Sequence, residues 1–173
     1  AWMTTKLNGI NTYFLPFNKG NNGGKGNPVG IGTYRTSYLW EDVLQKDSLL
    51  DIVQRFIHLQ EDKKNPKKAV MIFPRYHQLD VVRKLIDHTK NNGAGHNYLI
   101  QHSAGSGKSN SIAWIAYRLA SIHNDKDESV FDSVIVVTNR VVLDSQLQDT
   151  INSFEHVPGL LECIDDKKHS RDL

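Results

Sequence analysis

The feature that most constrains the fold is a short glycine-containing loop at residues 102–109, HSAGSGKS, because of what flanks it. The preceding residues 98–101, Tyr-Leu-Ile-Gln, form an apolar run that predicts a short strand. After the loop, apolar residues recur at helical spacing and predict a helix; they are Ile112, Ile115, Ala116 and Leu119. A strand, a tight loop and a helix in this order form one unit of an α/β fold.

The segments on either side continue this alternation. Residues 69–73 predict a short strand, and Leu79, Val82 and Ile86 predict a helix that ends before Gly93. The run Val-Ile-Val-Val at 134–137 is typical of a strand buried on both faces. A last helix follows, with an inward stripe of Leu143, Leu147, Ile151 and Phe154. We therefore expect an α/β fold in which helices flank an incomplete parallel sheet with right-handed crossovers.

The region before this alternation is rich in loops. Residues 18–32 hold six of the twelve glycines, and this segment is either a flexible linker or an ordered loop packed on a neighbour. A helix is expected near residues 48–59, with Leu49, Ile52, Val53 and Phe56 on one face. The charged run 61–68 is broken by Pro66 and marks a boundary. Residues 1–66 are thus expected to form a connecting region, and residues 67–173 the first part of a second unit.

The residue types in the loop suit phosphate binding. Glycine tolerates positive φ and lacks a Cβ atom, so Gly105 and Gly107 let backbone N–H groups turn toward an anion. The first turn of the following helix adds unpaired N–H groups and the positive end of its dipole. Lys108 is expected to reach the phosphates of ATP, and the Ser109 hydroxyl to coordinate Mg²⁺. The usual phosphate-loop (P-loop) pattern has glycine where this chain has His102, so a glycine turn that merely caps a helix is the alternative.

Composition limits the class of protein only loosely. The 173 residues carry a net charge of +2, which permits nucleic acid as a partner without requiring it. Cys163 is the only cysteine, so the chain cannot form an internal disulfide or a cysteine-rich metal site. No apolar run approaches the ~20 residues of a membrane helix. We expect a cytoplasmic protein.

Two further segments, one on each side of the loop, resemble motifs of a known protein family. FPRYHQ at 73–78 lies upstream of the loop and VVTNRVVLDSQL at 136–147 lies downstream, and the three together resemble superfamily 2 helicases and translocases. The resemblance implies a RecA-like motor domain in which a glutamine upstream of the loop recognises adenine. It also implies that Thr138, Asn139 and Arg140 approach DNA. The residues expected to bind the nucleotide are then Phe73, Arg75, Gln78, Ser103, Ala104, Gly105, Ser106, Gly107, Lys108 and Ser109.

Within that superfamily, the order of RYHQ, HSAGSGKS and TNRVVLDSQL resembles the R subunit of type I restriction enzymes. This implies an ATP-dependent site-specific deoxyribonuclease that translocates and cleaves double-stranded DNA together with methyltransferase and specificity subunits. A Walker B carboxylate pair cannot be identified, and Asp165-Asp166 lacks the motif that should follow it, so we expect this segment by itself to be inactive. The alternative is a nucleotide-binding or scaffolding module of another superfamily 2 protein.

Overall fold

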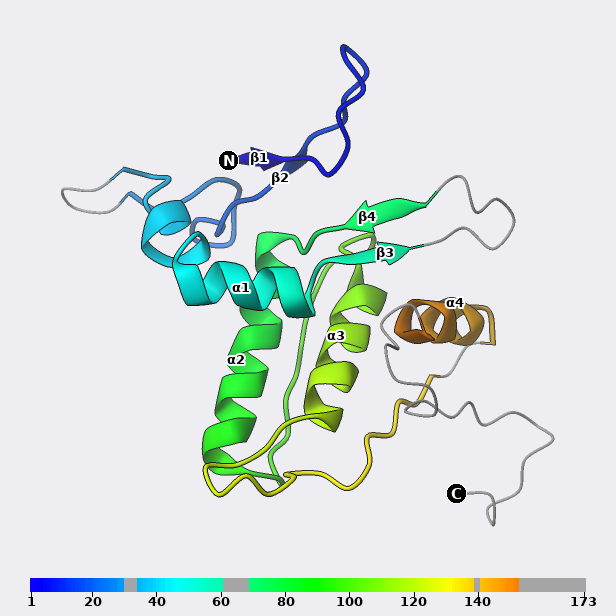
Figure 1. Ribbon diagram of the computed structural model, residues 1–173. Coiled ribbons are helices and arrows are strands. Elements are labelled where there is room, and N and C mark those ends of the chain that lie inside the picture. The colour runs from blue at the N-terminus through cyan, green and yellow to red at the C-terminus, as the bar shows by residue number, and fades with distance from the viewer. Residues whose placement is uncertain (30–33, 61–68, 139–140, 153–173) are drawn as a thin grey trace.

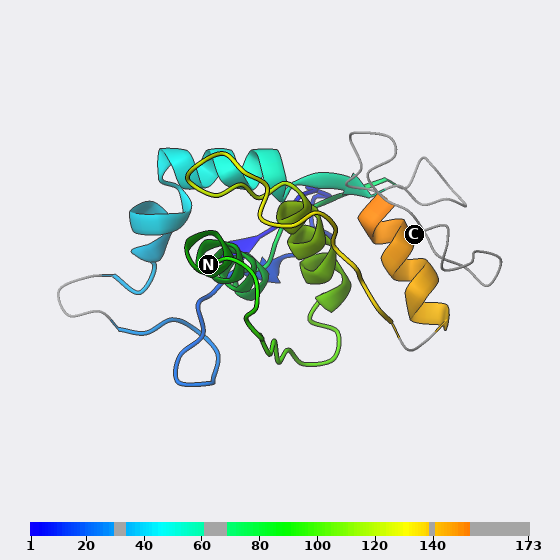
Figure 2. The ribbon, with the colours of Figure 1, turned by 90° about the horizontal axis from the view of Figure 1, so that it is seen from below.

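Two central helices organise the chain, α2 (Tyr76–Asn92) and α3 (Lys108–Ala120), which pack side by side (Figure 1). The computed structural model describes residues 1–29, 34–60, 69–138 and 141–152. A π-helix, η1 (Leu39–Val43), and the helix α1 (Lys46–Arg55) come before them, and α4 (Val141–Asn152) packs against α3. In the view from below, α2, α3 and α4 lie in a row and α1 crosses along one side of it (Figure 2).

The described strands form two small antiparallel pairs. Near the N-terminus β1 (Trp2–Met3) pairs with β2 (Leu15–Pro16), with Met3 opposite Leu15. Farther along, β3 (His58–Gln60) pairs with β4 (Val70–Ile72), with Leu59 opposite Met71. The chain is therefore an α/β protein, and the strand expected at residues 69–73 is present as β4.

The expected parallel sheet is not formed by the described residues. Neither the run at 98–101 nor the run at 134–137 belongs to a strand, and several of its apolar side chains face solvent: Leu99 is 92% exposed and Val137 is 86% exposed. A parallel strand is stable when hydrogen-bonded neighbours flank it and helices cover both faces. Within the described part of the chain neither run has such a neighbour, so the β-branched composition by itself does not produce a strand.

One hydrophobic core joins the two regions that the sequence separates at residue 66. Phe17, Tyr38 and Phe56 from the first region pack in the same cluster as Leu79 and Trp114 from the second. Several aromatic rings of this cluster meet edge to face, as Phe17 does with Tyr76 at a centroid distance of 5.6 Å, whereas Phe17 and Tyr38 stack. In the cluster the indole Nε1 of Trp114 donates to the carbonyl of Phe56 at 3.0 Å. The connecting region thus packs directly on the central helices.

Helix α1 ends earlier than its sequence pattern predicts. We expected a helix near residues 48–59, but α1 ends at Arg55 and β3 begins at His58. The reason is tertiary, because residues 58–60 pair with β4 and the His58 ring packs against the Trp114 ring. Of the expected apolar face, Ile52 and Phe56 are fully buried, whereas Leu49 and Val53 are exposed.

The glycine-rich segment is ordered over its described part, residues 18–29. Gly20 donates to the carbonyl of Gly26 at 2.9 Å, and the side chain of Asn27 accepts from the N–H of Lys19 at 2.8 Å. The ammonium of Lys19 lies over the rings of Tyr38 and Tyr76. These contacts favour the ordered loop over the flexible linker.

The helices that follow lie where the sequence predicts them, but the buried face of α3 differs from the expected stripe: Ala113 and Trp114 are fully buried, whereas Ile112 is 39% exposed. Helix α2 ends at Asn92, and the next residue, Gly93, has a φ of 73°. In α4, Leu147 is buried and Ile151 packs against the core. Phe154 and the side chain of Leu143 lie outside the described residues. Among the described helices, none has the length and apolar character that crossing a membrane requires.

Candidate nucleotide-binding loop

The glycine-containing loop forms a tight turn that leads into α3. Gly107 occupies the N-cap position of α3 with a φ of 80° and a ψ of 38°, and Gly105 has a φ of 72°. Both values lie in the left-handed region, which side chains with a Cβ atom rarely adopt. The N–H of Ser106 donates to the carbonyl of Ser103 at 3.3 Å and closes the turn. The spacing of the two glycines therefore has a direct backbone cause.

Lys108, the first residue of α3, folds its side chain back over the loop. Its Nζ donates to the carbonyl of Ser103 at 2.9 Å and to the carbonyl of His102 at 3.3 Å. These carbonyls are weaker partners for an ammonium than a phosphate would be, because a hydrogen bond between two ionised groups is stronger. The lysine is thus held beside the loop by contacts that an anion can replace.

The N-terminus of α2 supports the loop through three successive carbonyls. Arg75 Nη1 donates to the carbonyl of Gly105 at 3.4 Å, and Gln78 Nε2 donates to the carbonyl of Gly107 at 2.8 Å. Between them, His77 Nε2 lies 3.1 Å from the carbonyl of Ser106. A carbonyl oxygen only accepts, so the proton of this bond is on His77 Nε2. The segment RYHQ thus fixes the path of the loop residue by residue.

Gln78 is the most enclosed of these supports, with 3% of its surface exposed. Its Oε1 accepts from the backbone N–H of Arg75 at 2.8 Å while its Nε2 holds Gly107. A Cβ atom on Gly107 would lie 2.5 Å from Gln78 Nε2, closer than real contacts allow. Only glycine at this position permits the close approach.

A pair of histidines that the sequence analysis did not assign lies against the loop. The rings of His77 and His102 meet edge to face at a centroid distance of 4.8 Å. Burial lowers the pKa of His102 from its usual value, and the charges of His77 and Lys108 lower it further. The neutral form of the His102 ring is therefore favoured, at the position where the usual P-loop pattern has glycine. The departure from that pattern at position 102 was the one sequence signal that could have identified the pair.

Of the remaining predicted site residues, Ser103 and Ala104 lie within the loop, and the others lie apart from it or outside the described residues. The ring of Phe73 packs edge to face on Phe17 at 5.9 Å and is part of the core periphery. Thr138 is half-buried, and Asn139 and Arg140 lie outside the described residues. Ser103 and Ala104 are exposed on the outer side of the turn. The structure thus brings together Arg75, Gln78 and residues 103–109.

The arrangement fits a phosphate group. The first turn of α3 presents N–H groups that have no intrahelical partner, and the dipole of the helix favours an anion there. Ser106 Oγ is buried and has no hydrogen-bond partner among the described residues. The support for a metal site is weaker than that for a phosphate site. In the described ranges no three His, Cys, Asp or Glu side chains form a cluster, so Ser109 is the candidate metal ligand beside the loop.

A search of known proteins finds a relative of this chain among restriction enzyme subunits. A protein of Methanocaldococcus jannaschii with the provisional name type I restriction enzyme MjaVIIIP endonuclease subunit is 27% identical over 154 residues, which cover 78% of this chain. The chain spans 14% of that relative's length. No solved structure matches the chain significantly.

A family match confirms the resemblance to superfamily 2 ATPases that RYHQ and HSAGSGKS indicate. The matched residues, 77–171, begin in the segment that supports the loop and include the whole loop. They make up more than half of the 173 residues. The chain belongs to the SWI2/SNF2 ATPase family.

Proposed function

We propose that this chain is the ATP-binding segment of the R subunit of a type I restriction enzyme, which couples ATP hydrolysis to translocation and cleavage of double-stranded DNA. The observation that carries the proposal is the loop at residues 102–109, whose backbone α2 holds at three successive carbonyls. The membership of the SWI2/SNF2 ATPase family supports ATP as the nucleotide. The name of the relative from Methanocaldococcus jannaschii supports the restriction system.

In this proposal Lys108 exchanges its partners when ATP binds. Its Nζ leaves the carbonyls of His102 and Ser103 and contacts the β- and γ-phosphate oxygens, where negative charge must be stabilised. The loop N–H groups and the first turn of α3 donate to the same phosphates. Mg²⁺, bound at the hydroxyl of Ser109, would supply further charge neutralisation. The loop itself moves little, because Arg75, His77 and Gln78 already fix its carbonyls.

We propose that Gln78 and Arg75 contact adenine. A glutamine amide offers two donor hydrogens and two acceptor lone pairs, and Gln78 uses one of each for Gly107 and Arg75. It can therefore keep both bonds and still pair with an adenine edge, once the surface over it opens. Phe73 would reach the base only by leaving its contact with Phe17. The core position of Phe73 makes it the weakest of the expected adenine contacts.

The larger assembly follows from the same proposal. The runs at 98–101 and 134–137 become strands of a RecA-like parallel sheet when neighbouring strands bond to their backbones and helices cover their exposed side chains. Thr138, Asn139 and Arg140 follow the second run and approach the DNA backbone. DNA sequence is read by a specificity subunit, which together with a methyltransferase subunit forms the cytoplasmic complex.

Two experiments test the proposal. The first titrates Mg²⁺-ATP into the chain: Lys108→Ala should weaken binding at least about tenfold, because one charge-assisted contact is lost. Lys46→Ala, which removes an exposed lysine on α1, should leave binding unchanged. Equal affinity of the Lys108→Ala variant and the unmodified chain would contradict the assignment of the loop.

The second experiment uses the complete restriction complex. Lys108→Ala should abolish ATP-driven displacement of a DNA triplex while a gel shift on cognate duplex stays unchanged, because Lys108 faces only the nucleotide. A variant that displaces the triplex at the normal rate would show that the motor does not depend on this loop.

A further inference from the structure

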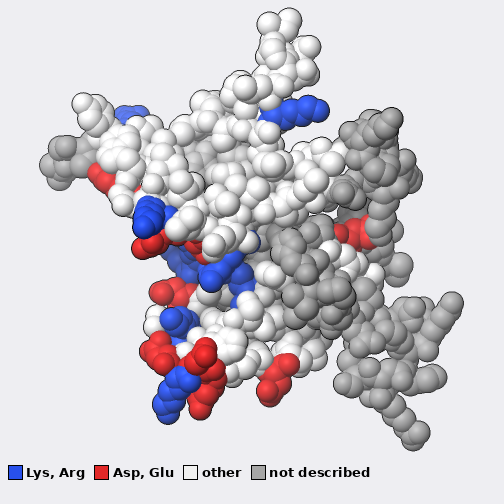
Figure 3. Space-filling model, viewed as in Figure 1, with Lys and Arg blue, Asp and Glu red and all other residues white. Residues whose placement is uncertain are grey.

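A second cluster of positive charge lies at the end of α3 opposite the phosphate loop. A cavity of about 880 Å³ opens between α1 and the C-terminal halves of α2 and α3. Five cations line it: Arg55, Arg83, Lys84, Lys90 and Arg118. Figure 3 shows lysine and arginine side chains gathered over α1 and α2, with Asp and Glu among them. A cavity of this size takes a small ligand or a stretch of polymer backbone.

The three guanidinium groups in this cavity share a single carboxylate. Asp51 lies 3.1 Å from Arg83, 3.2 Å from Arg118 and 3.7 Å from Arg55. Arg83 is further tied to Ser48 by two hydrogen bonds of 2.9 Å. Three positive charges therefore surround one negative charge, and Asp51 does not neutralise the positive charge of all three arginines.

Among these side chains, Arg118 gives the clearest indication of a missing hydrogen-bond partner. Its side chain is 10% exposed, and its Nη1 is buried with no hydrogen-bond partner among the described residues. Burial lowers the pKa of Arg118, Asp51 opposes this, and the charges of Arg55 and Arg83 lower it further. A buried guanidinium with an unpaired N–H group is unfavourable, and an added anion relieves it.

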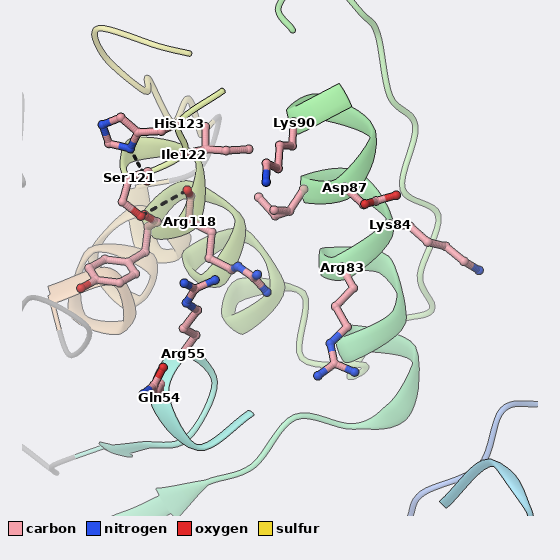
Figure 4. Close-up of a pocket in the computed structure, with 12 residues that line it drawn as sticks. Gln54, Arg55, Arg83, Lys84, Asp87, Lys90, Arg118, Ser121, Ile122 and His123 are labelled. Carbon is pink, nitrogen blue, oxygen red and sulfur yellow. Dashed lines mark hydrogen bonds between the residues drawn. The ribbon is translucent and has the colours of Figure 1, made fainter. Parts of the chain in front are cut away.

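The two remaining lysines hold weak partners. Lys90 lies 3.8 Å from Asp125, whose side chain is 94% exposed, and Lys84 pairs with Asp80 at 2.7 Å on the surface. Exposed ion pairs of this kind contribute little to stability, so a ligand can exchange them. In Figure 4, Lys90 and Arg118 point into the space between α2 and α3, and Lys84 and Asp87 point to the outer side of α2. The carboxylate of Asp87 thus opposes an anion mainly from the rim.

We propose that this cavity is a second phosphate-binding site, in which Arg55, Lys90 and Arg118 hold the phosphate group of a nucleic-acid backbone or of a free nucleotide. The planar fork of an arginine matches phosphate oxygens in pairs, and a lysine adds a point charge. The site lies at the C-terminal end of α3, whereas Lys108 lies at its N-terminal end. It therefore does not depend on nucleotide binding at the loop.

The test measures phosphate binding with the loop disabled. In the full chain carrying Lys108→Ala, a ³¹P NMR titration should show one bound pyrophosphate per chain. Adding Arg55→Gln and Lys90→Gln should weaken that binding about tenfold, since two charge-assisted contacts are lost. Both side chains are more than half exposed, at 57% and 52%, so the fold should tolerate these changes. The matched control, Lys6→Gln with Lys25→Gln, removes the same charge from exposed positions elsewhere and should change nothing.

Competition identifies the source of the phosphate. Displacement of pyrophosphate by a short DNA duplex assigns the site to a nucleic-acid backbone, and displacement by ATP alone assigns it to a free nucleotide. The proposal is overturned if pyrophosphate does not bind the Lys108→Ala chain, or if the cavity and control variants bind it equally. It is also overturned if polyglutamate binds where pyrophosphate does not, because the partner is then an acidic protein segment.

Discussion

The contact between Gly107 and Gln78 predicts that the two glycines of the loop differ sharply in their tolerance of alanine. Both have positive φ, 72° at Gly105 and 80° at Gly107. A Cβ atom on Gly105 would meet nothing within 4 Å, whereas one on Gly107 would lie 2.5 Å from Gln78 Nε2. The same substitution therefore tests backbone strain at one position and strain plus a steric clash at the other.

The structure allows the size of the difference to be estimated. The left-handed conformation costs about 1–2 kcal/mol for a residue with a Cβ atom, so Gly105→Ala should lower the free energy of unfolding by that amount. Gly107→Ala carries the same cost and also displaces the Gln78 amide, which is buried. Leaving that amide unpaired costs about 1–3 kcal/mol more. We expect a total loss of about 2–5 kcal/mol for Gly107→Ala.

Urea denaturation without nucleotide, followed by circular dichroism, measures both losses apart from any effect on ATP binding. Combining Gly107→Ala with Gln78→Ala should recover part of the stability, because the clash is removed, and the two changes should not be additive. Equal losses for Gly105→Ala and Gly107→Ala, or strict additivity in the double variant, would refute the hydrogen bond between Gln78 and Gly107.

Three further predictions follow from the core, from pH and from the proposed chemistry. Trp114→Phe should lower the free energy of unfolding by about 1–2 kcal/mol, because the bond from Nε1 to the Phe56 carbonyl is lost; Trp40→Phe, which changes a half-exposed ring, should have little effect, and similar losses for both would contradict this reasoning. Burial lowers the pKa of His58, so the unfolded chain binds the proton more readily. Stability should be complete above the unfolded value of about 6.5 and be lost as the pH falls toward the folded value; the urea midpoint should drop between pH 7.5 and pH 5, by less in His58→Gln, and an unchanged midpoint would argue against burial of this ring. Finally, the purified chain should bind Mg²⁺-ATP without appreciable turnover, because no carboxylate pair that could complete the metal site has been identified; magnesium-dependent phosphate release that Lys108→Ala abolishes would prove this wrong.

The sequence by itself determined the parts of the molecule that depend on neighbouring residues in the chain. Helical spacing of Leu79 and Val82, followed by Gly93, predicts α2 and its end, because side chains three or four positions apart share a face. The loop is equally local, since Gly105 and Gly107 are the residues that tolerate its left-handed turns. The family match rests on the same region of the chain.

Tertiary structure decided whatever required a partner distant in the sequence. Residues 58–60 left their helical pattern because β4 supplies hydrogen bonds, and the run at 134–137 formed no strand because no described neighbour supplies them. Gln78 was predicted to contact adenine, a role that stays a prediction, but its bond to Gly107 joins residues 29 positions apart. The three arginines around Asp51 come from three helices, and only the pair of Asp51 and Arg55 is local, at a spacing of four residues. Spacing along a chain encodes which residues share a face, whereas the partner across that face is set only when the elements pack.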